Sequence, residues 1–509
     1  MNNQKIAKKI LGNKLKNPDA ANQLTKLKEK ILDISKRMDD SDEIEALLHG
    51  FDGGYIPSGP SGLISRGRDD VLPTGRNFYS LDPQRIPTKA SHEIGKRLAD
   101  AVIEKHTNDT GKIPENIAMV WWCGDIMWAN GEVMSQILAL IGVKPKWQPN
   151  GRRNGFEVIP LDELKRPRID VTIRVSGITR DSFPDCIEMV DEAIRTVAEL
   201  DEPLNMNFVR KHSLEKKENG TDDWQDATTR LFCAKPGTYG NGTSLAVYAS
   251  AWKDDQDLTD VFIYFNGYGY GKGFFGKEMH KEFHDNLKTV DATSTNTATD
   301  EYDIFGCCCH FGTEGGLCNA AKQISEKDVK FYHSDTRDPA RVKVTDLADE
   351  VRRVVRTKVL NPKWIKGQMR HGYKGAGDIS KRIGRVYGWS ATTKQVDNWI
   401  FDDITKTFVQ DKEMREWFHE NNPWALEEIE RRLLEAEQRE LWDADPEMLD
   451  ELKEHYMELE GIMEEKMGDV EGDYQGGAID IFTDEDVGDW KVKMDEIRAK
   501  IKTDKNKLK

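Results

Sequence analysis

Residues 169–175 read IDVTIRV and are followed at 183–200 by FPDCIEMVDEAIRTVAEL. The first stretch alternates apolar and polar side chains and is rich in β-branched residues, a pattern typical of a strand. The second has a helical pattern, with Pro184 near its start, where a helix tolerates proline. A strand followed by a helix is the repeating unit of a sheet covered by helices.

Strand and helix patterns continue on both sides of this unit. Further strands are predicted at 117–122 and 329–332. Further helices are predicted at 90–106, 131–141, 346–359, 378–386, 424–442 and 447–465. The expected fold class is therefore α/β, a multi-domain layered sheet with helices that ends in a mostly helical C-terminal region.

Shifts in composition divide the chain into segments. A Gly/Pro-rich stretch with aromatic residues follows a helical start, and we interpret it as an ordered loop because flexible linkers seldom carry so many aromatic side chains. The expected segments are an N-terminal helical segment (1–50), the Gly/Pro loop (51–88), an α/β domain (89–230), a Gly/aromatic and Cys-rich α/β region (231–345), a helical region (346–466) and an acidic then basic tail (467–509).

The charge of the chain is unevenly distributed. The net charge is −16, yet residues 413–490 hold 27 acidic residues against 6 basic ones. The rest of the chain is nearly neutral and has no strongly basic composition, so we expect no nucleic-acid partner. No apolar run is long enough to span a bilayer, and residues 1–30 lack the apolar centre of a secretory signal. We therefore expect a cytoplasmic protein.

Nucleotide chemistry is not predicted for this chain. The closest approach to a phosphate-binding loop is NGYGYGKG at 266–273, which lacks the first glycine and the final Ser or Thr of that motif. If ATP drives the reaction, we expect another chain to hydrolyse it.

The segment CCCHFGTEGGLC at 307–318 is the most unusual in the sequence. Cys307, Cys309 and His310 are soft ligands for zinc, iron or an iron–sulfur cluster. Adjacent residues point in different directions, however, so we do not expect three consecutive cysteines to converge easily on one ion. The alternative is that they are small buried hydrophobic residues. The seven cysteines are an odd number, which favours reduced thiols over a disulfide framework.

Several stretches, in order along the chain, resemble the large subunit of the class I tetrapyrrole metal chelatases, the family of cobaltochelatase CobN and the magnesium chelatase H subunit. The longest are GGYIPSGPSG (53–62), VLPTGRNFYSLDPQRIPT (71–88), RPRIDVTIRVSGITRDSFP (166–184), AKPGTYGNG (234–242), LNPKWIKGQMRHGYKGAGDISKRI (360–383) and RRLLEAEQRELW (431–442). The resemblance is closer to the cobalt branch, notably at YIPSGPSG and RHGYKGA. It departs from that branch at FGCCCHFGTE, where an acidic, tyrosine-rich stretch is usual.

The resemblance implies a subunit that binds a tetrapyrrole and inserts a divalent metal. It favours Co²⁺ with hydrogenobyrinate a,c-diamide, as in cobalamin biosynthesis, and leaves Mg²⁺ with protoporphyrin IX, or Ni²⁺, as alternatives. It also implies partner AAA+ motor subunits that hydrolyse ATP. Family members are usually longer, so we expect a separate chain to supply an N-terminal lobe. A non-catalytic tetrapyrrole-binding scaffold is the rival function, and a metal or redox protein built on the cysteines is a third.

The stretch RHGYKG at 370–375 holds side chains suited to metal insertion. Arg370 and Lys374 could bind the substrate's carboxylates, and Tyr373 could stack on the ring. His371 is the primary candidate for metal ligand and proton acceptor. A loop joining two helices, with a hydrogen-bonded histidine, is the structural alternative.

Secondary candidates are distributed along the chain, and each has a structural alternative. His310, Glu314, His333 and Asp335 could bind the metal or accept a proton, although a lone histidine is more often structural. Further substrate-binding candidates are Tyr55, Arg76, Tyr79, Arg174 and Arg180, the last two because they flank the end of a predicted strand.

Overall fold

The computed structural model describes residues 18–79 and 81–467, together with 492 and 499. The chain forms two compact units, Met1–Asp82 and Pro83–Lys509, and each is described by itself. The six segments predicted from the sequence are finer than this division. The predicted tail at 467–509 lies almost entirely outside the described residues.

The first unit joins two helices to a loop with little regular structure. Helices α2 (Pro18–Asp39) and α3 (Glu43–Phe51) are followed by two three-residue strands, β1 (Ser58–Pro60) and β2 (Asn77–Tyr79), which pair in parallel. The Arg76 side chain donates hydrogen bonds to the carbonyls of Asp70, Val71 and Pro73 at 2.8–3.1 Å. The Gly/Pro loop is therefore ordered by hydrogen bonds between its own residues.

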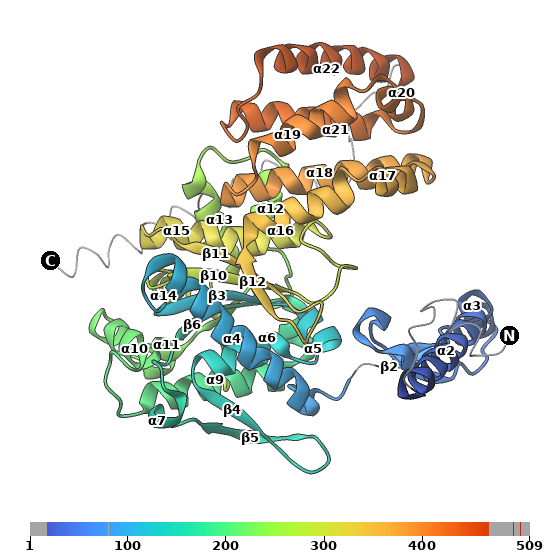
Figure 1. The fold of residues 1–509 in the computed structure, drawn as a ribbon. Coiled ribbons are helices and arrows are strands. Elements are labelled where there is room, and N and C mark those ends of the chain that lie inside the picture. Colours follow the sequence, from blue (N-terminus) through green and yellow to red (C-terminus); the bar gives the residue numbers. More distant parts are fainter. Residues whose placement is uncertain (1–17, 80, 468–491, 493–498, 500–509) are drawn as a thin grey trace. The chain divides into compact units, whose positions relative to one another are not determined.

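The centre of the second unit is one sheet of described strands: β3 (Asn116–Trp121), β6 (Asp170–Val175), β7 (Leu231–Cys233), β8 (Tyr268–Gly271), β9 (Phe274–Glu278), β10 (Ala292–Thr297), β11 (Lys330–Asp335) and β12 (Lys343–Asp346). Their order is β12-β11-β10-β3-β6-β7-β8-β9 (Figure 1). The strands from β11 to β7 are parallel, while β12 at one end and the β8–β9 hairpin at the other are antiparallel. All residues of β3 and β6 are buried, as expected for parallel strands covered on both faces.

Helices cover both faces of this sheet. Helices α4 (Lys89–Thr110), α6 (Glu132–Leu140) and α9 (Pro184–Glu199) pack as one layer, and α13 (Asp255–Asn266), α14 (His280–Leu287) and α15 (Gly316–Ser325) as another. Ala118 and Val120 of β3 pack with Phe262, Phe283 and Leu317 of the second layer in one apolar core. Alternate residues of a strand point to opposite faces, so Ile117, Met119 and Trp121 face the first layer.

The connections within the second unit hold the remaining described elements. The helices are α5 (Cys123–Ala129), α7 (Leu161–Leu164), α8 (Gly177–Ser182), α10 (Phe208–Glu218), α11 (Trp224–Thr228) and α12 (Thr243–Tyr248). The strands β4 (Val143–Trp147) and β5 (Arg153–Val158) form a separate antiparallel pair.

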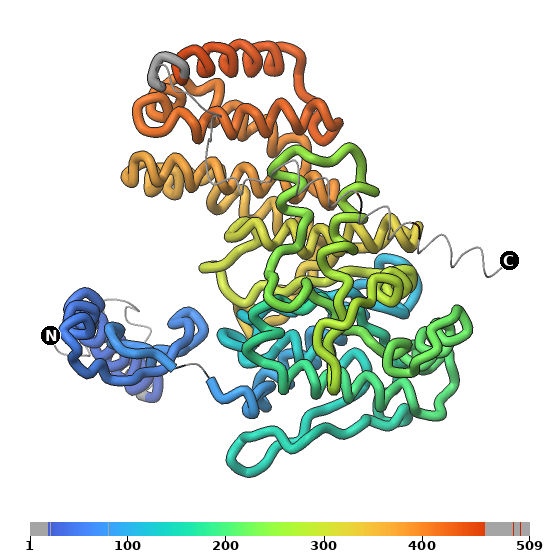
Figure 2. The backbone as a smooth tube through the Cα atoms, turned by 180° about the vertical axis from the view of Figure 1, so that it is seen from behind, coloured from blue at the N-terminus to red at the C-terminus, as the bar shows by residue number. Residues whose placement is uncertain are grey.

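A layer of helices follows the sheet in the sequence. It consists of α16 (Leu347–Val354), α17 (Pro362–Met369), α18 (Gly372–Thr393), α19 (Asn398–Ile404), α20 (Lys412–Asn421), α21 (Pro423–Gln438) and α22 (Pro446–Met467), with π-helical turns at Val355–Val359 and Thr405–Gln410. Figures 1 and 2 show the longer of these helices, orange to red, packed side by side. They share one apolar core that includes Trp389, Phe408 and Leu426.

The predicted fold class is confirmed: the chain is α/β with a layered sheet and a mostly helical C-terminal region. The strands predicted at 117–122, 169–175 and 329–332 are β3, β6 and β11. The helix predicted at 378–386 is the middle of the longer α18. No described helix is long and apolar enough to cross a membrane.

Strand order places a switch point between β3 and β10. From β3 the chain proceeds to β6 and β7 on one side, and then returns to β10 and β11 on the other side of β3. Open parallel sheets bind ligands at the carboxyl ends of the strands where the direction of winding reverses. The residues that follow β3 and end β10 therefore mark the expected site.

Candidate functional site

A histidine–carboxylate pair lies at this switch point. His310 and Glu314 lie on a π-helical turn, His310–Gly315, which leads directly into α15. Glu314 Oε1 accepts hydrogen bonds from Nε1 of Trp122, just after β3, at 2.7 Å, and from Oγ1 of Thr295, near the end of β10, at 2.6 Å. The pair is thereby anchored to the two strands on either side of the switch point. Single π-helical turns within helices are often found at functional sites.

One atom of each residue in this pair remains free of a hydrogen bond. His310 Nδ1 and Glu314 Oε2 are buried, 3.4 Å apart, and form an ion pair without hydrogen-bond geometry. The Trp122 ring packs edge-on against the His310 ring at a centroid distance of 5.4 Å. Two buried polar atoms without hydrogen bonds are the kind of exception that calls for a functional explanation.

The electrostatics of the pair favour a charged histidine and a charged carboxylate. Burial by itself lowers the pKa of His310, but the Glu314 carboxylate and Cys307 outweigh it, so this pKa lies above its ordinary value. Burial by itself raises the pKa of Glu314, but His310, Thr295 and Trp122 outweigh it and lower this pKa. The pair can therefore bind a cation or exchange a proton.

The three consecutive cysteines lie directly before this pair. The sulfur atoms of Cys307, Cys308 and Cys309 lie within 4.8 Å of one another. The expectation that adjacent cysteines would diverge was wrong, because the helix begins within the run. Cys307 precedes the first helical turn, and its Sγ accepts the backbone N–H of Cys309 at 3.3 Å.

Cys308 opens into a cavity of about 290 Å³ in the helical layer. The cavity is also lined by Tyr373, the predicted ring-stacking residue, and by Arg385 of α18. This volume is at the low end of the range for small-molecule sites. The cysteine run and one residue of RHGYKG therefore border the same cavity.

Arg174 and Arg180 hold the loop 234–242. Arg180 is buried and donates to the carbonyls of Ala234, Lys235 and Thr238 at 3.0–3.2 Å, and it pairs with Asp181. Arg174 Nε donates to Oδ1 of Asn266 at 3.0 Å. Both guanidinium groups are occupied within the fold, which corresponds to the structural alternative for these two arginines.

His333 and Asp335 lie at the carboxyl end of β11. His333 is buried, its Nε2 is 2.8 Å from Oγ1 of Thr297, and burial lowers its pKa. Asp335 accepts two hydrogen bonds from the Arg337 side chain, at 2.9 and 2.7 Å, and a third from the Arg337 backbone N–H at 3.0 Å. Their hydrogen bonds are made within the fold, and the Glu314 carboxylate acts on His333 electrostatically.

Arg370, His371 and Lys374 are exposed at the junction of α17 and α18. Lys374 pairs with Asp378 one turn further along the helix. Gly388, which packs against Phe311 of the π-helical turn, is 17 residues from His371. At a rise of ~1.5 Å per residue this corresponds to about 25 Å along α18, so the structure does not bring His371 together with His310.

Tyr55, Arg76 and Tyr79 belong to the first unit. Tyr55 and Tyr79 are exposed there, and Arg76 holds the loop as described above.

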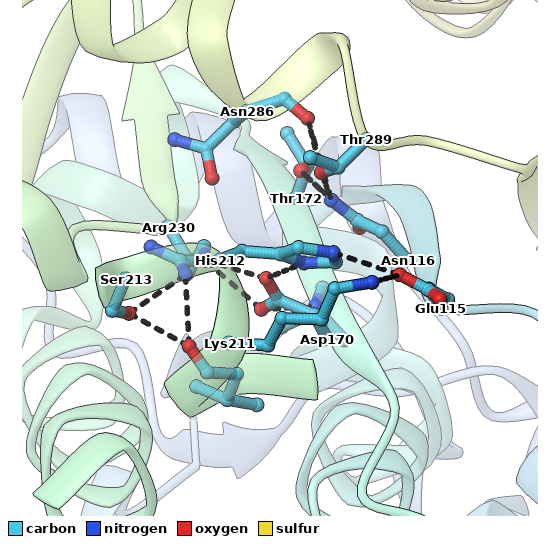
Figure 3. A network of polar contacts seen from close by, with 12 residues as sticks. Glu115, Asn116, Asp170, Thr172, Lys211, His212, Ser213, Arg230, Asn286 and Thr289 are labelled. Atoms are coloured by element: carbon cyan, nitrogen blue, oxygen red, sulfur yellow. Dashed lines mark hydrogen bonds and ion pairs between the residues drawn. The ribbon is translucent and has the colours of Figure 1, made fainter. Parts of the chain in front are cut away.

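A second polar cluster was missed by the sequence reasoning. Figure 3 shows it at the amino ends of β3 and β6, whereas the switch point lies at the carboxyl ends of the strands. Asp170 accepts from Arg230 Nε at 2.9 Å and lies 2.8 Å from His212 Nδ1, and His212 Nε2 lies 3.2 Å from Glu115. Asp170, His212 and Arg230 are buried, and each is held by several partners. The cluster therefore fastens α10 to the sheet, and no signal in the spacing could have revealed it.

Comparisons with known proteins agree along most of the chain. The sequence pattern of the CobN/Magnesium Chelatase family matches residues 1–449. An uncharacterized protein of Methanocaldococcus jannaschii is 59% identical over 90% of this chain and 37% of its own length. The magnesium-chelatase H subunit of Chlorobaculum parvum is 38% identical over 85% of this chain and 34% of its own length.

A solved structure is similar as well. The catalytic subunit of cobaltochelatase from Mycobacterium tuberculosis has a TM-score of 0.84 and 36% identity, covering 87% of this chain and 38% of that one. The chain spans about a third of the length of the curated relatives it matches.

Proposed function

Because the chain belongs to the CobN/magnesium chelatase family of tetrapyrrole chelatase large subunits, we propose that it binds a tetrapyrrole and a divalent metal and takes part in inserting the metal into the ring. Insertion requires that the ion lose water and that the pyrrole N–H protons pass to a base. Histidine and carboxylate side chains can meet both needs near neutral pH.

The observation that carries this proposal is the His310–Glu314 pair at the switch point. Its two facing atoms lack hydrogen bonds, and its remaining donors come from Trp122 and Thr295 beside the two central strands. Glu314 is the base and ligand in this proposal, and His310 is a ligand that loses its proton as the metal arrives. Tyr373 stacks on the ring, and Arg370 and Lys374 bind its carboxylates, at the exposed start of α18 rather than beside Glu314.

The remaining candidates have smaller parts in the proposal. His371 is a second metal ligand and proton acceptor that acts at the exposed end of α18. Tyr55, Arg76 and Tyr79, all in the first unit, remain candidates for binding the macrocycle. Arg174 and Arg180 support substrate binding by holding the loop 234–242. His333 and Asp335 remain metal-ligand candidates. To bind a metal they would exchange their hydrogen bonds with Thr297 and Arg337 for bonds to the ion.

Co²⁺ and hydrogenobyrinate a,c-diamide are the first choice of substrates, with Mg²⁺ and protoporphyrin IX second and Ni²⁺ as a further alternative. The stretches YIPSGPSG and RHGYKGA support the cobalt branch. ATP is hydrolysed by AAA+ motor subunits. The complex works in the cytoplasm as a nitrogen–metal ligase, and this chain is inactive without its partners.

A non-catalytic tetrapyrrole-binding scaffold is the second candidate. The observation that favours it is that His371, the primary candidate for proton acceptor, is exposed and lies apart from His310. A scaffold would bind the ring in the same place but would not depend on a base at Glu314.

Metal insertion by the assembled complex separates these two functions. We expect the Glu314→Gln variant to bind the ring as the wild type does, as measured by quenching of Trp fluorescence. Its rate of metal insertion is expected to fall by ~10²–10⁴-fold, the usual contribution of a general base. Glu326→Gln, at an exposed residue at the far end of α15, is the matched control and is expected to retain full activity. Insertion by Glu314→Gln at the wild-type rate would refute the assigned role of the pair.

A further inference from the structure

We propose that the sulfur atoms of Cys307, Cys308 and Cys309 together bind a single thiophilic divalent ion, and that this ion is the metal substrate, held beside His310 and Glu314 before insertion. The inference rests on the proposed function and narrows the range of metals that the protein would insert. It restricts the metal to ions such as Co²⁺ or Ni²⁺ and disfavours Mg²⁺.

The geometry of the three sulfur atoms fits one ion. All three lie within 4.8 Å of one another. Thiolates bound to one tetrahedral ion at ~2.3 Å lie ~3.8 Å apart, so rotamer adjustments of about 1 Å close the site. A four-iron cluster attaches each cysteine to a different iron and requires wider spacing. Among the described residues this is the one group of three potential ligands with such convergence.

The backbone explains how three adjacent residues converge. Cys307 precedes the helix, whereas Cys308 and Cys309 lie in its first turn. The Cys307 side chain folds back over the helix start and accepts the Cys309 N–H. A thiolate is favoured in this position, because the first turn of a helix offers free N–H groups and a partial positive charge.

Positive groups lie around the cluster. The Arg174 guanidinium acts on Cys309, the Arg385 guanidinium on Cys308, and His310 on Cys307. Three thiolates with one divalent ion leave a net charge of −1, which these cations balance.

The cavity provides a route for an ion but not for the ring. Its volume of about 290 Å³ is bordered by Cys308, Tyr373 and Arg385. It can admit a hydrated ion, whereas a tetrapyrrole with its side chains requires a larger site. His310 follows Cys309 directly, so an ion released by the sulfur atoms reaches the histidine–carboxylate pair without leaving the site.

Ligand softness determines which metals this site retains. Thiolates bind Co²⁺, Ni²⁺ and Zn²⁺ well, while Mg²⁺ prefers water and carboxylate oxygen. A thiolate site before a histidine–carboxylate site therefore selects against the abundant Mg²⁺ by ligand type.

The test is a Co²⁺ titration of the reduced full chain followed by absorption. We expect a thiolate-to-cobalt charge-transfer band, together with the visible bands of tetrahedral cobalt, and neither band with Mg²⁺. The Cys307→Ala/Cys308→Ala/Cys309→Ala variant is expected to lose the band and more than ~100-fold in Co²⁺ affinity, beyond the 10–100-fold cost of an outer-shell partner. Cys186→Ala, in α9, is the control and is expected to retain both.

If the triple variant fails to fold, Cys308→Ala alone and protection of the wild-type thiols from alkylation provide the same test, with three thiols expected to be protected by Co²⁺. Co²⁺ binding without the charge-transfer band, or equal protection by Mg²⁺, would overturn the inference. A tetrapyrrole titration of the same samples separates the two proposals. Ring binding without the cobalt band refutes the cysteine site alone, and the cobalt band without ring binding supports an ion site while refuting the proposed function.

Discussion

Replacing Asp170 with asparagine is expected to destabilise the second unit by ~3–5 kcal/mol, the usual cost of leaving a buried charge without its partner. Asp170 and Arg230 are both fully buried, and their side chains meet at 2.9 Å. The neutral amide keeps the shape but leaves the Arg230 guanidinium without its counter-charge. Its NH₂ group also competes with the proton on His212, whose Nδ1 lies 2.8 Å from the carboxylate.

Urea unfolding, followed by Trp fluorescence and by far-ultraviolet circular dichroism, measures this loss. Coincident transitions with the two probes are required before a free energy of unfolding is extracted. Arg230→Met and the double variant complete the cycle, and residues of one network are expected to couple by ~0.5–3 kcal/mol.

The network lies at the opposite edge of the sheet from His310 and Glu314. Tetrapyrrole binding by folded Asp170→Asn should therefore equal that of the wild type. A loss of stability below ~1 kcal/mol, or additive single variants, would refute the assignment of Asp170 as the counter-charge of Arg230.

Four further predictions concern the pH dependence of stability, packing and the RHGYKG stretch. His212 holds the pKa of Glu115 at about 2. The stabilisation from Glu115 is therefore present above its unfolded pKa and is lost as the pH falls toward 2. In Glu115→Gln the midpoint of urea unfolding should depend less on pH over this range. The pKa of His212 is raised, because the hydrogen bonds to Asp170 and Glu115 outweigh burial, so its stabilisation is present below the unfolded pKa and should fade as the pH rises through the folded pKa. In Gly315→Ala the new Cβ would overlap the Thr392 side chain; overpacking should cost ~1–3 kcal/mol by thermal unfolding, and an unchanged Tm would contradict the packing. His371→Ala should change stability by less than ~0.5 kcal/mol, as for other exposed side chains, and should slow ATP-driven insertion; wild-type turnover would remove His371 from the mechanism.

The periodicity of apolar residues was sufficient to predict most helices and strands, but it did not predict the order of the strands in the sheet. The alternation in 169–175 predicts β6 because side-chain direction repeats every two residues along a strand. The pairing of β3 with β10 joins residues far apart in the sequence, and no periodicity encodes such a contact. The switch point followed only from that pairing.

The candidate site was predictable to a similar degree. His310 and Glu314 were identified by residue type, while their anchors Trp122 and Thr295 come from two distant strands. Convergence of the three cysteines was missed because the helix boundary was not known. RHGYKG was the primary candidate, but the structure shows its histidine exposed at the start of a long helix.

Deleting one residue should have different effects in the π-helical turn at His310–Gly315 and in the helix α15 that follows it. Such a turn holds one residue more than an α-helical turn. Removing one codon within 311–313 would let the turn close into an α-helix, with both flanking stretches still facing as before. Removing one codon within 316–325 would instead rotate everything upstream by ~100° about the helix axis and turn the cysteines away from their cavity. Loss of a single residue should therefore be tolerated in the turn but not in α15.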